Sequence, residues 1–258
     1  MRVASWAEAG NLAADRLTGR IPILESLRAR KRRARRLYVL HGAQGIGDIL
    51  KEAQGLPIEE RSRSELDAMT RGAVHQGVVL EIDPLPVHRI ETWARQTFPK
   101  NAVIVALDSV EDPQNFGAIV RSAAALGACG ALFAKDRSAP ISAVAQKSAA
   151  GAMDYIDLVQ TTNLVRGLEL LKKAGFWVAG LDGAGEKSLW EADLAGRIVL
   201  VVGSEGKGMR RLVTEACDYL LRIPISGPIT SLNASVSAAI ALAEYARQQQ
   251  TRPVSQGA

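Results

Sequence analysis

The sequence predicts an α/β protein in which a larger C-terminal domain, built on a parallel sheet, follows a small α/β domain. From residue 102 onward, short apolar runs alternate with segments of helical length, which is typical of parallel strands covered by helices on both faces. Pro84, Pro86 and Pro99 interrupt the chain before this region begins. Three polar motifs then lie where strands are expected to lead into helices, which predicts a ligand site at strand ends.

Composition narrows the class of protein. The chain has 258 residues, of which 47% are hydrophobic and 5% aromatic, enough for a sizeable aliphatic core. A formal charge of +5 and a pI near 9.4 favour a polyanionic partner, because lysines and arginines that neutralise phosphates release counterions.

Cys129 and Cys217 lie in apolar segments, and neither has another cysteine or a histidine at a metal-ligand spacing. We therefore expect no disulfide framework, no metal site and a reducing compartment. No apolar run is long enough for a signal sequence or for the roughly 18 residues of a membrane span. The sequence predicts a cytoplasmic protein without a membrane partner.

Residues 1–18 are expected to form an N-terminal extension with little periodic structure, and a short helix is the alternative. Residues 19–84 are predicted to form the small α/β domain. It begins with a helix from Pro22 that continues into a basic block between Arg28 and Arg36, and a strand over 37–40 follows directly. Three further elements complete the domain, namely helices around 46–54 and 64–69 and a strand over 77–82.

The prolines indicate a linker over residues 85–101 that contains one short helix around 90–96. The remaining segment, 102–250, is predicted to form the parallel-sheet domain. Its expected strands are the apolar runs 103–107, 131–134, 155–159, 177–181, 198–202 and 219–223.

The first motif follows the strand expected over 103–107. Asp112 suits a helix cap and Pro113 suits a first turn, so a helix is expected to begin there. Its apolar face leaves Arg121 pointing away from the core, and Asn115 in the first turn offers both a donor and an acceptor. Gly117 lies one turn before Arg121, which predicts room for a group beside the guanidinium. The alternative is an ordinary amphipathic helix with a solvated arginine.

The second motif, Gly203-Ser204-Glu205-Gly206, follows a very apolar strand and is expected at the carboxyl edge of the sheet. It lacks the spacing of a Walker loop or a dinucleotide fingerprint, and Glu205 would repel a phosphate, so nucleotide hydrolysis and dinucleotide binding are disfavoured. A cationic or hydroxyl-bearing ligand suits this carboxylate better. A simple glycine turn is the alternative.

The third motif, Ser231-Leu232-Asn233-Ala234-Ser235, opens a segment with an apolar helical stripe. We expect this helix to be capped near Ser231, with Asn233 and Ser235 in its first turn. Uncommitted N–H groups at such a helix start can hold a carboxylate or an activated hydroxyl. A well-capped helix without a ligand is the alternative.

Taken together and in this order, the three motifs resemble those of the SpoU/TrmH family of RNA ribose 2'-O-methyltransferases, which belongs to the SPOUT class. The resemblance covers about residues 20–249. It includes Gly72–Gly77, similar to a segment of the bacterial branch that methylates a guanosine of large-subunit ribosomal RNA, whereas Thr18–Ile23 departs from the family's Tyr-Gly-x-His-Pro-Val. The resemblance implies a SPOUT methyltransferase domain with a deep trefoil knot, preceded by a small domain that binds the RNA substrate.

The resemblance also implies S-adenosyl-L-methionine as cofactor and a homodimer with each site near the subunit interface. Carried over by position, the catalytic residues would be Arg121, Asn115, Glu205 and Asn233. The cofactor pocket would be lined by Gly203, Ile223, Leu232, Leu181, Gly183 and Ser231. Because a guanidinium stays protonated, we expect Arg121 to grip a phosphate and stabilise oxyanion charge rather than to act as a base.

RNA contacts by the small domain are expected from the basic block, through Arg28, Arg32 and Arg35, and solvated charge at a helix end is the alternative. His75 and Gln76 could contact RNA or close a turn. Three alternatives stay open. The first is the same reaction on transfer RNA or at a thiostrepton-type resistance site in ribosomal RNA, the second is a non-catalytic RNA-binding or ribosome-assembly protein, and the third is a nucleotide-dependent oxidoreductase or NTPase. The catalytic set is present, which disfavours the second, and missing glycine fingerprints disfavour the third.

Overall fold

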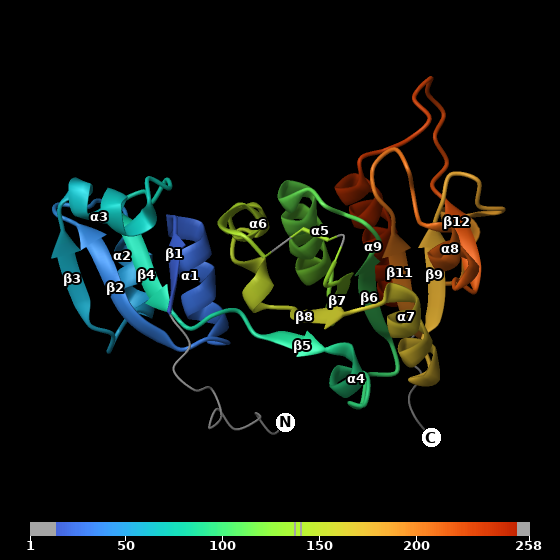
Figure 1. The fold of residues 1–258 in the computed structure, drawn as a ribbon, viewed down its shortest axis with the longest axis horizontal. Coiled ribbons are helices and arrows are strands. Elements are labelled where there is room, and N and C mark those ends of the chain that lie inside the picture. The colour runs from blue at the N-terminus through green and yellow to red at the C-terminus, as the bar shows by residue number, and fades with distance from the viewer. Residues whose placement is uncertain (1–13, 137, 140, 252–258) are drawn as a thin grey trace. The chain divides into compact units, whose positions relative to one another are not determined.

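The structure is a computed structural model that describes residues 14–136, 138–139 and 141–251 (Figure 1). The chain forms two compact units, Met1–Pro86 and Val87–Ala258. The elements of the N-terminal unit are, in chain order, β1 (Asp15–Thr18), α1 (Arg20–Ala29), β2 (Ala34–Leu40), α2 (Gly47–Glu52), β3 (Ile58–Arg61), α3 (Arg63–Thr70) and β4 (Val78–Ile82).

The N-terminal unit is built on a mixed sheet with the strand order β1-β4-β2-β3, in which β4 runs antiparallel to β1 and β2, and β3 runs parallel to β2. Ile23 of α1 and Ile49 of α2 are buried in one core cluster with apolar residues of the strands. α3 begins at a capping box, because the Ser62 hydroxyl accepts from the Glu65 N–H and the Glu65 carboxylate accepts from the Ser62 N–H. Since Ser62 directly follows β3, this cap turns the chain from strand to helix.

Two expectations for this unit are wrong. α1 ends at Ala29, where Arg30 adopts a left-handed φ of 50°, so most of the basic block lies in the following turn and in β2 rather than on a helix. Asp15–Thr18 is not an irregular extension, because it pairs along its length with β4. Residues 1–13 of the expected extension lie outside the described residues.

The C-terminal unit is built on an eight-stranded sheet with the order β10-β12-β9-β11-β6-β7-β8-β5, and every neighbouring pair is parallel. Its elements are β5 (Val87–Arg89), α4 (Ile90–Trp93), β6 (Ala102–Leu107), α5 (Pro113–Ala125), β7 (Gly130–Ala134), α6 (Ala143–Ala149), η1 (Ala152–Asp154), β8 (Asp157–Thr161), α7 (Leu164–Lys173), β9 (Trp177–Leu181), β10 (Lys187–Ser188), η2 (Leu189–Glu191), β11 (Arg197–Val202), α8 (Arg211–Glu215), β12 (Tyr219–Arg222) and α9 (Ala234–Thr251).

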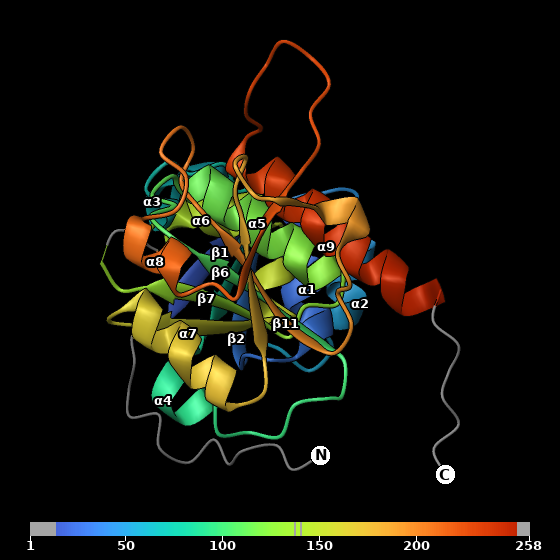
Figure 2. The ribbon, with the colours of Figure 1, turned by 90° about the vertical axis from the view of Figure 1, so that its right-hand side faces the viewer.

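Helices cover both faces of this sheet: α5, α6 and α9 lie on one face, and α4, α7 and α8 on the other (Figure 2). Along β6, Ile104 and Ala106 belong to the core beneath α4 and α7, whereas Val103 and Val105 are buried on the opposite face, as side-chain alternation requires. The predicted α/β fold class, in which a small α/β domain precedes a parallel-sheet domain along the chain, is confirmed.

The segment expected to be a linker, 85–101, contributes instead to the C-terminal core. Its first part forms the edge strand β5, which pairs with β8, and α4 follows at once. Ile90, Trp93 and Phe98 are buried, and the Trp93 indole Nε1 donates to Asp157 Oδ2 at 2.9 Å. The prolines therefore mark turns around a buried segment rather than a connector.

The parallel arrangement brings distant segments to one edge of the sheet. The neighbouring strands β12, β9, β11 and β6 all end there, and the loops that follow them begin at residues 223, 182, 203 and 108. Figure 2 shows the loop between β12 and α9 projecting beyond the others. All three polar motifs of the sequence lie in or directly after these loops.

Candidate active site at the carboxyl ends of four neighbouring strands

Three of the four predicted catalytic side chains are bonded to one another. Asn115 lies in the first turn of α5, Glu205 in the loop after β11, and Asn233 immediately before α9. Asn233 Nδ2 donates to Asn115 Oδ1 at 3.0 Å and to Glu205 Oε2 at 3.2 Å. Asn115 Nδ2 donates to the same Oε2 at 3.5 Å, a long bond. We call this group the polar cluster.

The start of α9 fixes the orientation of the Asn233 amide. Its Oδ1 accepts from the backbone N–H of Ser235 at 2.8 Å and from the Ser235 hydroxyl at 2.6 Å. The Nδ2 group must therefore face Asn115 and Glu205. Asn233 therefore caps the helix, two residues beyond Ser231, near which the sequence predicts the cap.

Glu205 is carried by a tight loop. Ser204 and Gly208 exchange two backbone hydrogen bonds, one in each direction, at 3.0 and 2.9 Å. A Cβ on Gly203 would lie 2.2 Å from the carbonyl carbon of Gly208, so only glycine lets the chain fold back this closely. The glycine turn that the sequence offered as an alternative is present, and it exposes Glu205 at its tip.

An ion pair between a buried carboxylate and a partly exposed arginine, which sequence analysis missed, anchors this loop. Asp108, at the end of β6, is fully buried, and its Oδ1 accepts from Arg210 Nε and Nη2, each at 2.7 Å. Its Oδ2 accepts from the backbone N–H of Arg210 at 2.7 Å. The pair joins the segment that leads to Asn115 to the segment that carries Glu205. The only sequence signal was an acidic residue directly after an apolar strand, which needs a partner when buried.

Two cavities meet at this edge of the sheet. One, of about 370 Å³, is lined by all six residues predicted to bind the cofactor, Leu181, Gly183, Gly203, Ile223, Ser231 and Leu232. The other, of about 600 Å³, is lined by the loop after β6 and by Asn115. Ser204, Glu205, Lys207 and Gly208 line both cavities, so the glycine turn forms their shared wall.

Arg121 does not join the polar cluster within the described chain. It is exposed on α5 and lines neither cavity. Gly117, expected to leave room beside it, is buried against α6, and a Cβ there would lie 2.4 Å from the carbonyl oxygen of Ala145. The missing side chain thus permits close helix packing, and the expectation that it leaves room for a ligand is wrong.

The arginines predicted to bind RNA in the basic block are bonded within the N-terminal unit. Arg28 pairs with Glu25 at 3.1 Å, and Arg35 Nε donates to Asp83 Oδ1 at 2.7 Å. Arg32 is only 6% exposed, and its Nη1 donates to the backbone carbonyl of Asp83 at 3.4 Å. The Arg32 guanidinium is enclosed by the unit itself, which argues against an RNA contact by this residue.

His75 closes a turn, which is one of the two roles considered for it. The ring is buried, Nδ1 accepts from the Gly77 N–H at 3.0 Å, and Nε2 therefore carries the proton and donates to Asp67 Oδ1 at 3.1 Å. Both ring nitrogens of His75 are therefore already engaged in hydrogen bonds within the unit, which argues against a hydrogen bond from His75 to RNA. Gln76 is exposed, and its Oε1 accepts from the backbone N–H of Arg20 at 2.8 Å.

Within the described residues there is no group of three or more His, Cys, Asp or Glu side chains placed to hold a metal ion.

Burial raises the pKa of Cys129 to about 11 and that of Cys217 to about 12, so both thiols are protonated near neutral pH. Among the helices of the described segments, none has the length and apolar character needed to cross a membrane.

Comparison with known proteins matches each of the two units to a family model. Residues 102–243 match the model of the SpoU rRNA Methylase family, and residues 16–88 match that of the RNA 2'-O ribose methyltransferase substrate binding domain. The chain is 41% identical over 230 residues to the 23S rRNA (guanosine-2'-O-)-methyltransferase RlmB of Pseudomonas aeruginosa, which covers 86% of this chain and 92% of the relative. It is 43% identical over 242 residues to an uncharacterized tRNA/rRNA methyltransferase of Mycobacterium sp. (strain KMS), covering 90% of this chain and 76% of the relative.

Solved structures agree in fold. The SpoU methyltransferase AviRb from Streptomyces viridochromogenes, in complex with AdoMet, superposes with a TM-score of 0.77 at 22% identity, covering 93% of this chain and 92% of that one. An RNA 2'-O ribose methyltransferase gives a TM-score of 0.76 at 24% identity, covering 92% and 90%. The family model spans more than half of the chain, and a relative above 40% identity spans most of it. The chain therefore belongs to the SpoU/TrmH family of RNA 2'-O-ribose methyltransferases.

Proposed function

We propose that this enzyme methylates the ribose 2'-hydroxyl of a guanosine in large-subunit ribosomal RNA, with S-adenosyl-L-methionine as the donor. The observation that carries the proposal is the shared wall between the two cavities at the sheet edge. A cofactor in the smaller cavity and a nucleotide in the larger one would meet across the glycine turn, beside Glu205.

The smaller cavity offers what an adenosine-type cofactor requires. Leu181, Ile223 and Leu232 provide apolar surface for a flat base, and the glycines at 183 and 203 leave backbone groups accessible for hydrogen bonds. The Glu205 carboxylate suits a positively charged sulfonium nearby. When bound there, S-adenosyl-L-methionine supplies an electrophilic methyl group.

The polar cluster would position the sugar. Glu205 Oε2 accepts from the two asparagine amides, whereas its Oε1 has no hydrogen-bond partner in the part of the chain that the structure describes. We assign this Oε1 to accept a hydrogen bond from the 2'-hydroxyl and align its oxygen for in-line attack. Asn115 and Asn233 hold the carboxylate in place, and Asp108 with Arg210 holds the two loops together.

Arg121 would enter the reaction from a second copy of the chain. Its guanidinium is exposed and outside the polar cluster of its own chain, so a homodimer that brings α5 of one copy to the cavities of the other would complete the site. There it would bind the phosphate next to the target ribose and stabilise the charge that develops on the attacking 2'-oxygen.

The trefoil knot around the C-terminal loops stays a prediction.

The preference for ribosomal RNA rests on the relative at 41% identity, which is named for 23S rRNA and guanosine. Transfer RNA is the second candidate, because the mycobacterial relatives are named for both RNA classes.

The decisive experiment incubates the protein with methyl-labelled S-adenosyl-L-methionine and either unmodified ribosomal RNA or unmodified transfer RNA. We expect label in the ribosomal RNA at one guanosine, where the 2'-O-methyl group makes the neighbouring linkage resistant to alkali. Label only in transfer RNA, or label on a base, would contradict the proposal. Calorimetry with the cofactor alone, compared with nicotinamide dinucleotide and ATP, tests the donor independently.

A further inference from the structure

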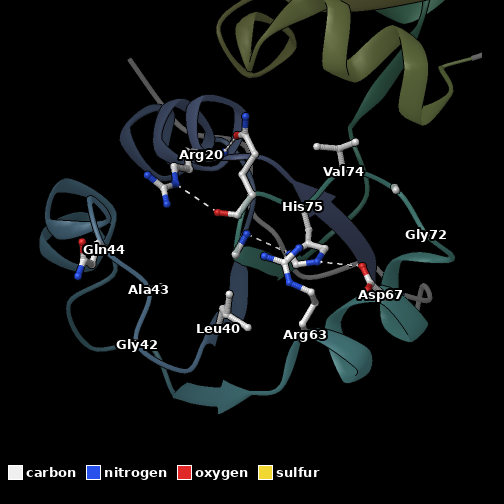
Figure 3. A pocket seen from close by; sticks show the side chains of 13 residues that line it. Arg20, Leu40, Gly42, Ala43, Gln44, Arg63, Asp67, Gly72, Val74 and His75 are labelled. Atoms are coloured by element: carbon white, nitrogen blue, oxygen red, sulfur yellow. Dashed lines mark hydrogen bonds and ion pairs between the residues drawn. The ribbon is translucent and has the colours of Figure 1, made fainter.

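A separate pocket lies in the N-terminal unit, far along the sequence from the polar cluster. It has a volume of about 700 Å³, within the roughly 300–1,000 Å³ typical of ligand sites. Its walls come from the start of α1, the turn after β2, α3 and the loop over 72–77 (Figure 3). We call it the loop pocket.

The walls of the loop pocket are fixed by internal hydrogen bonds. His75 is locked between Gly77 and Asp67, as described above. Arg20 and Gln76 are joined twice, because the Arg20 N–H donates to Gln76 Oε1 at 2.8 Å and Arg20 Nε donates to the Gln76 carbonyl at 3.2 Å. The Arg20 guanidinium is thus held by neutral backbone carbonyls, those of Gln76 and Gly45, and no carboxylate among the described residues forms an ion pair with it.

The charges of the loop pocket differ from those of the basic block. Arg28, Arg35 and Arg36 each have a carboxylate partner. In contrast, neither Arg20 nor Arg63, which both line the loop pocket, forms an ion pair with any residue the structure describes. Two guanidinium groups without an ion-pair partner among the described residues favour an anion at this concave site, because each planar guanidinium can donate to two oxygens of a tetrahedral phosphate.

Two further residues that line the loop pocket, Val74 and Asp67, can contact a nucleobase. Val74 lies at the pocket with 63% of its surface exposed, an apolar face on which a base can pack. Asp67 uses Oδ1 for His75 and can accept an N–H from a base edge at its other oxygen. An unstacked nucleotide carries all three groups, namely a phosphate, an apolar face and N–H donors, whereas the bases of a duplex are stacked and unavailable.

We propose that the loop pocket binds one unstacked nucleotide of single-stranded RNA, with its phosphate on Arg20 and Arg63 and its base on Val74. This inference rests on the proposed function, because it takes RNA to be the substrate. It assigns RNA recognition in this unit to the loop pocket and not to the ion-paired basic block.

The test measures binding of the full-length protein to a short, fluorescein-labelled, single-stranded oligoribonucleotide of mixed sequence, and to the duplex of the same sequence, by fluorescence anisotropy. Arg63→Gln should weaken single-strand binding about tenfold, because a charge-assisted hydrogen bond to phosphate is lost. The double variant Arg20→Gln/Arg63→Gln should lose about a hundredfold, and its salt dependence should fall by a slope of about 0.7 for each lost contact. Val74→Asp, at an exposed position, should also weaken the single strand.

Arg28→Gln is the matched control, since it removes one positive charge from the same unit outside the loop pocket, and it should change affinity less than about twofold. Melting temperatures of all variants establish that they fold. Equal affinities for Arg63→Gln and Arg28→Gln, or an equal loss for single strand and duplex, would overturn the proposal. If the pocket variants lose binding but no RNA accepts a methyl group, the proposed function fails while the loop pocket stands.

Discussion

The C-terminal loops and the N-terminal basic block use polar side chains in opposite ways. At the C-terminal sheet edge, Asn115, Glu205 and Asn233 come from three separate segments and bond to one another, and Glu205 lines two cavities. In the basic block, the charge of Arg28 is already neutralised by a neighbouring carboxylate, and Arg32 is enclosed by its own unit. Residue type alone therefore does not indicate a binding surface. A polar side chain is available to a ligand only where the fold has not already paired or enclosed it.

The largest effect that would sharpen this comparison concerns Arg121. Arg121→Ala and Arg121→Lys should each lower the rate of methyl transfer at least about a hundredfold, because a lysine cannot replace the two-pronged contact of a guanidinium with phosphate. Cofactor affinity should stay within severalfold of wild type, since Arg121 does not line the smaller cavity. Rates with labelled cofactor and calorimetry test both statements, and normal turnover in Arg121→Lys would remove the assignment.

A second prediction concerns Gly117, which the sequence interpretation assigned to ligand space and the structure assigns to packing. Gly117→Ala should lower the free energy of unfolding by about 1–3 kcal/mol, because the new Cβ pushes against the backbone of α6. Gly47→Ala is the control, as a Cβ there would meet nothing within 4 Å. Denaturant unfolding of both variants provides the measurement, and equal stability of Gly117→Ala and wild type would favour the ligand-space interpretation after all.

The smallest expected effects are differences in protein stability between substitutions at two residues of the basic block. Arg32→Gln should destabilise the protein by about 1–2 kcal/mol, because it removes hydrogen bonds from a buried guanidinium. Arg28→Gln removes an exposed ion pair and should cost no more than about 0.5 kcal/mol. Thermal melts give the two values, and the reverse order would show that burial is a poor guide to the role of these residues.

Much of the fold could be predicted because periodicity and capping are local. Asp112 and Pro113 opened α5 as expected, and the apolar runs became parallel strands, with β8 displaced by two residues from the expected 155–159 to Asp157–Thr161. β3 was missed because Ile58–Arg61 is polar and lies at the sheet edge, so it carries no apolar signal. β1 was missed because pairing with a distant strand, rather than its own pattern, makes it a strand.

For the candidate site, the polar cluster could be predicted because each motif lies directly after a strand end or at a helix start, where the fold leaves little freedom. The Asp108–Arg210 pair could not, since 102 residues separate two side chains that share no spacing rule. The ion pairs of the basic block could not be predicted either, because the carboxylate that each arginine contacts depends on the tertiary structure.

The most direct test of the account is a heterodimer that joins one Arg121→Ala chain to one Glu205→Gln chain. The two chains would be co-expressed with different affinity tags, and their product purified over both. If each site combines the polar cluster of one copy with Arg121 of the other, one of the two sites is intact, and about half of the wild-type methyl transfer should return although each variant homodimer is inactive. A heterodimer as inactive as the two homodimers would contradict the shared site.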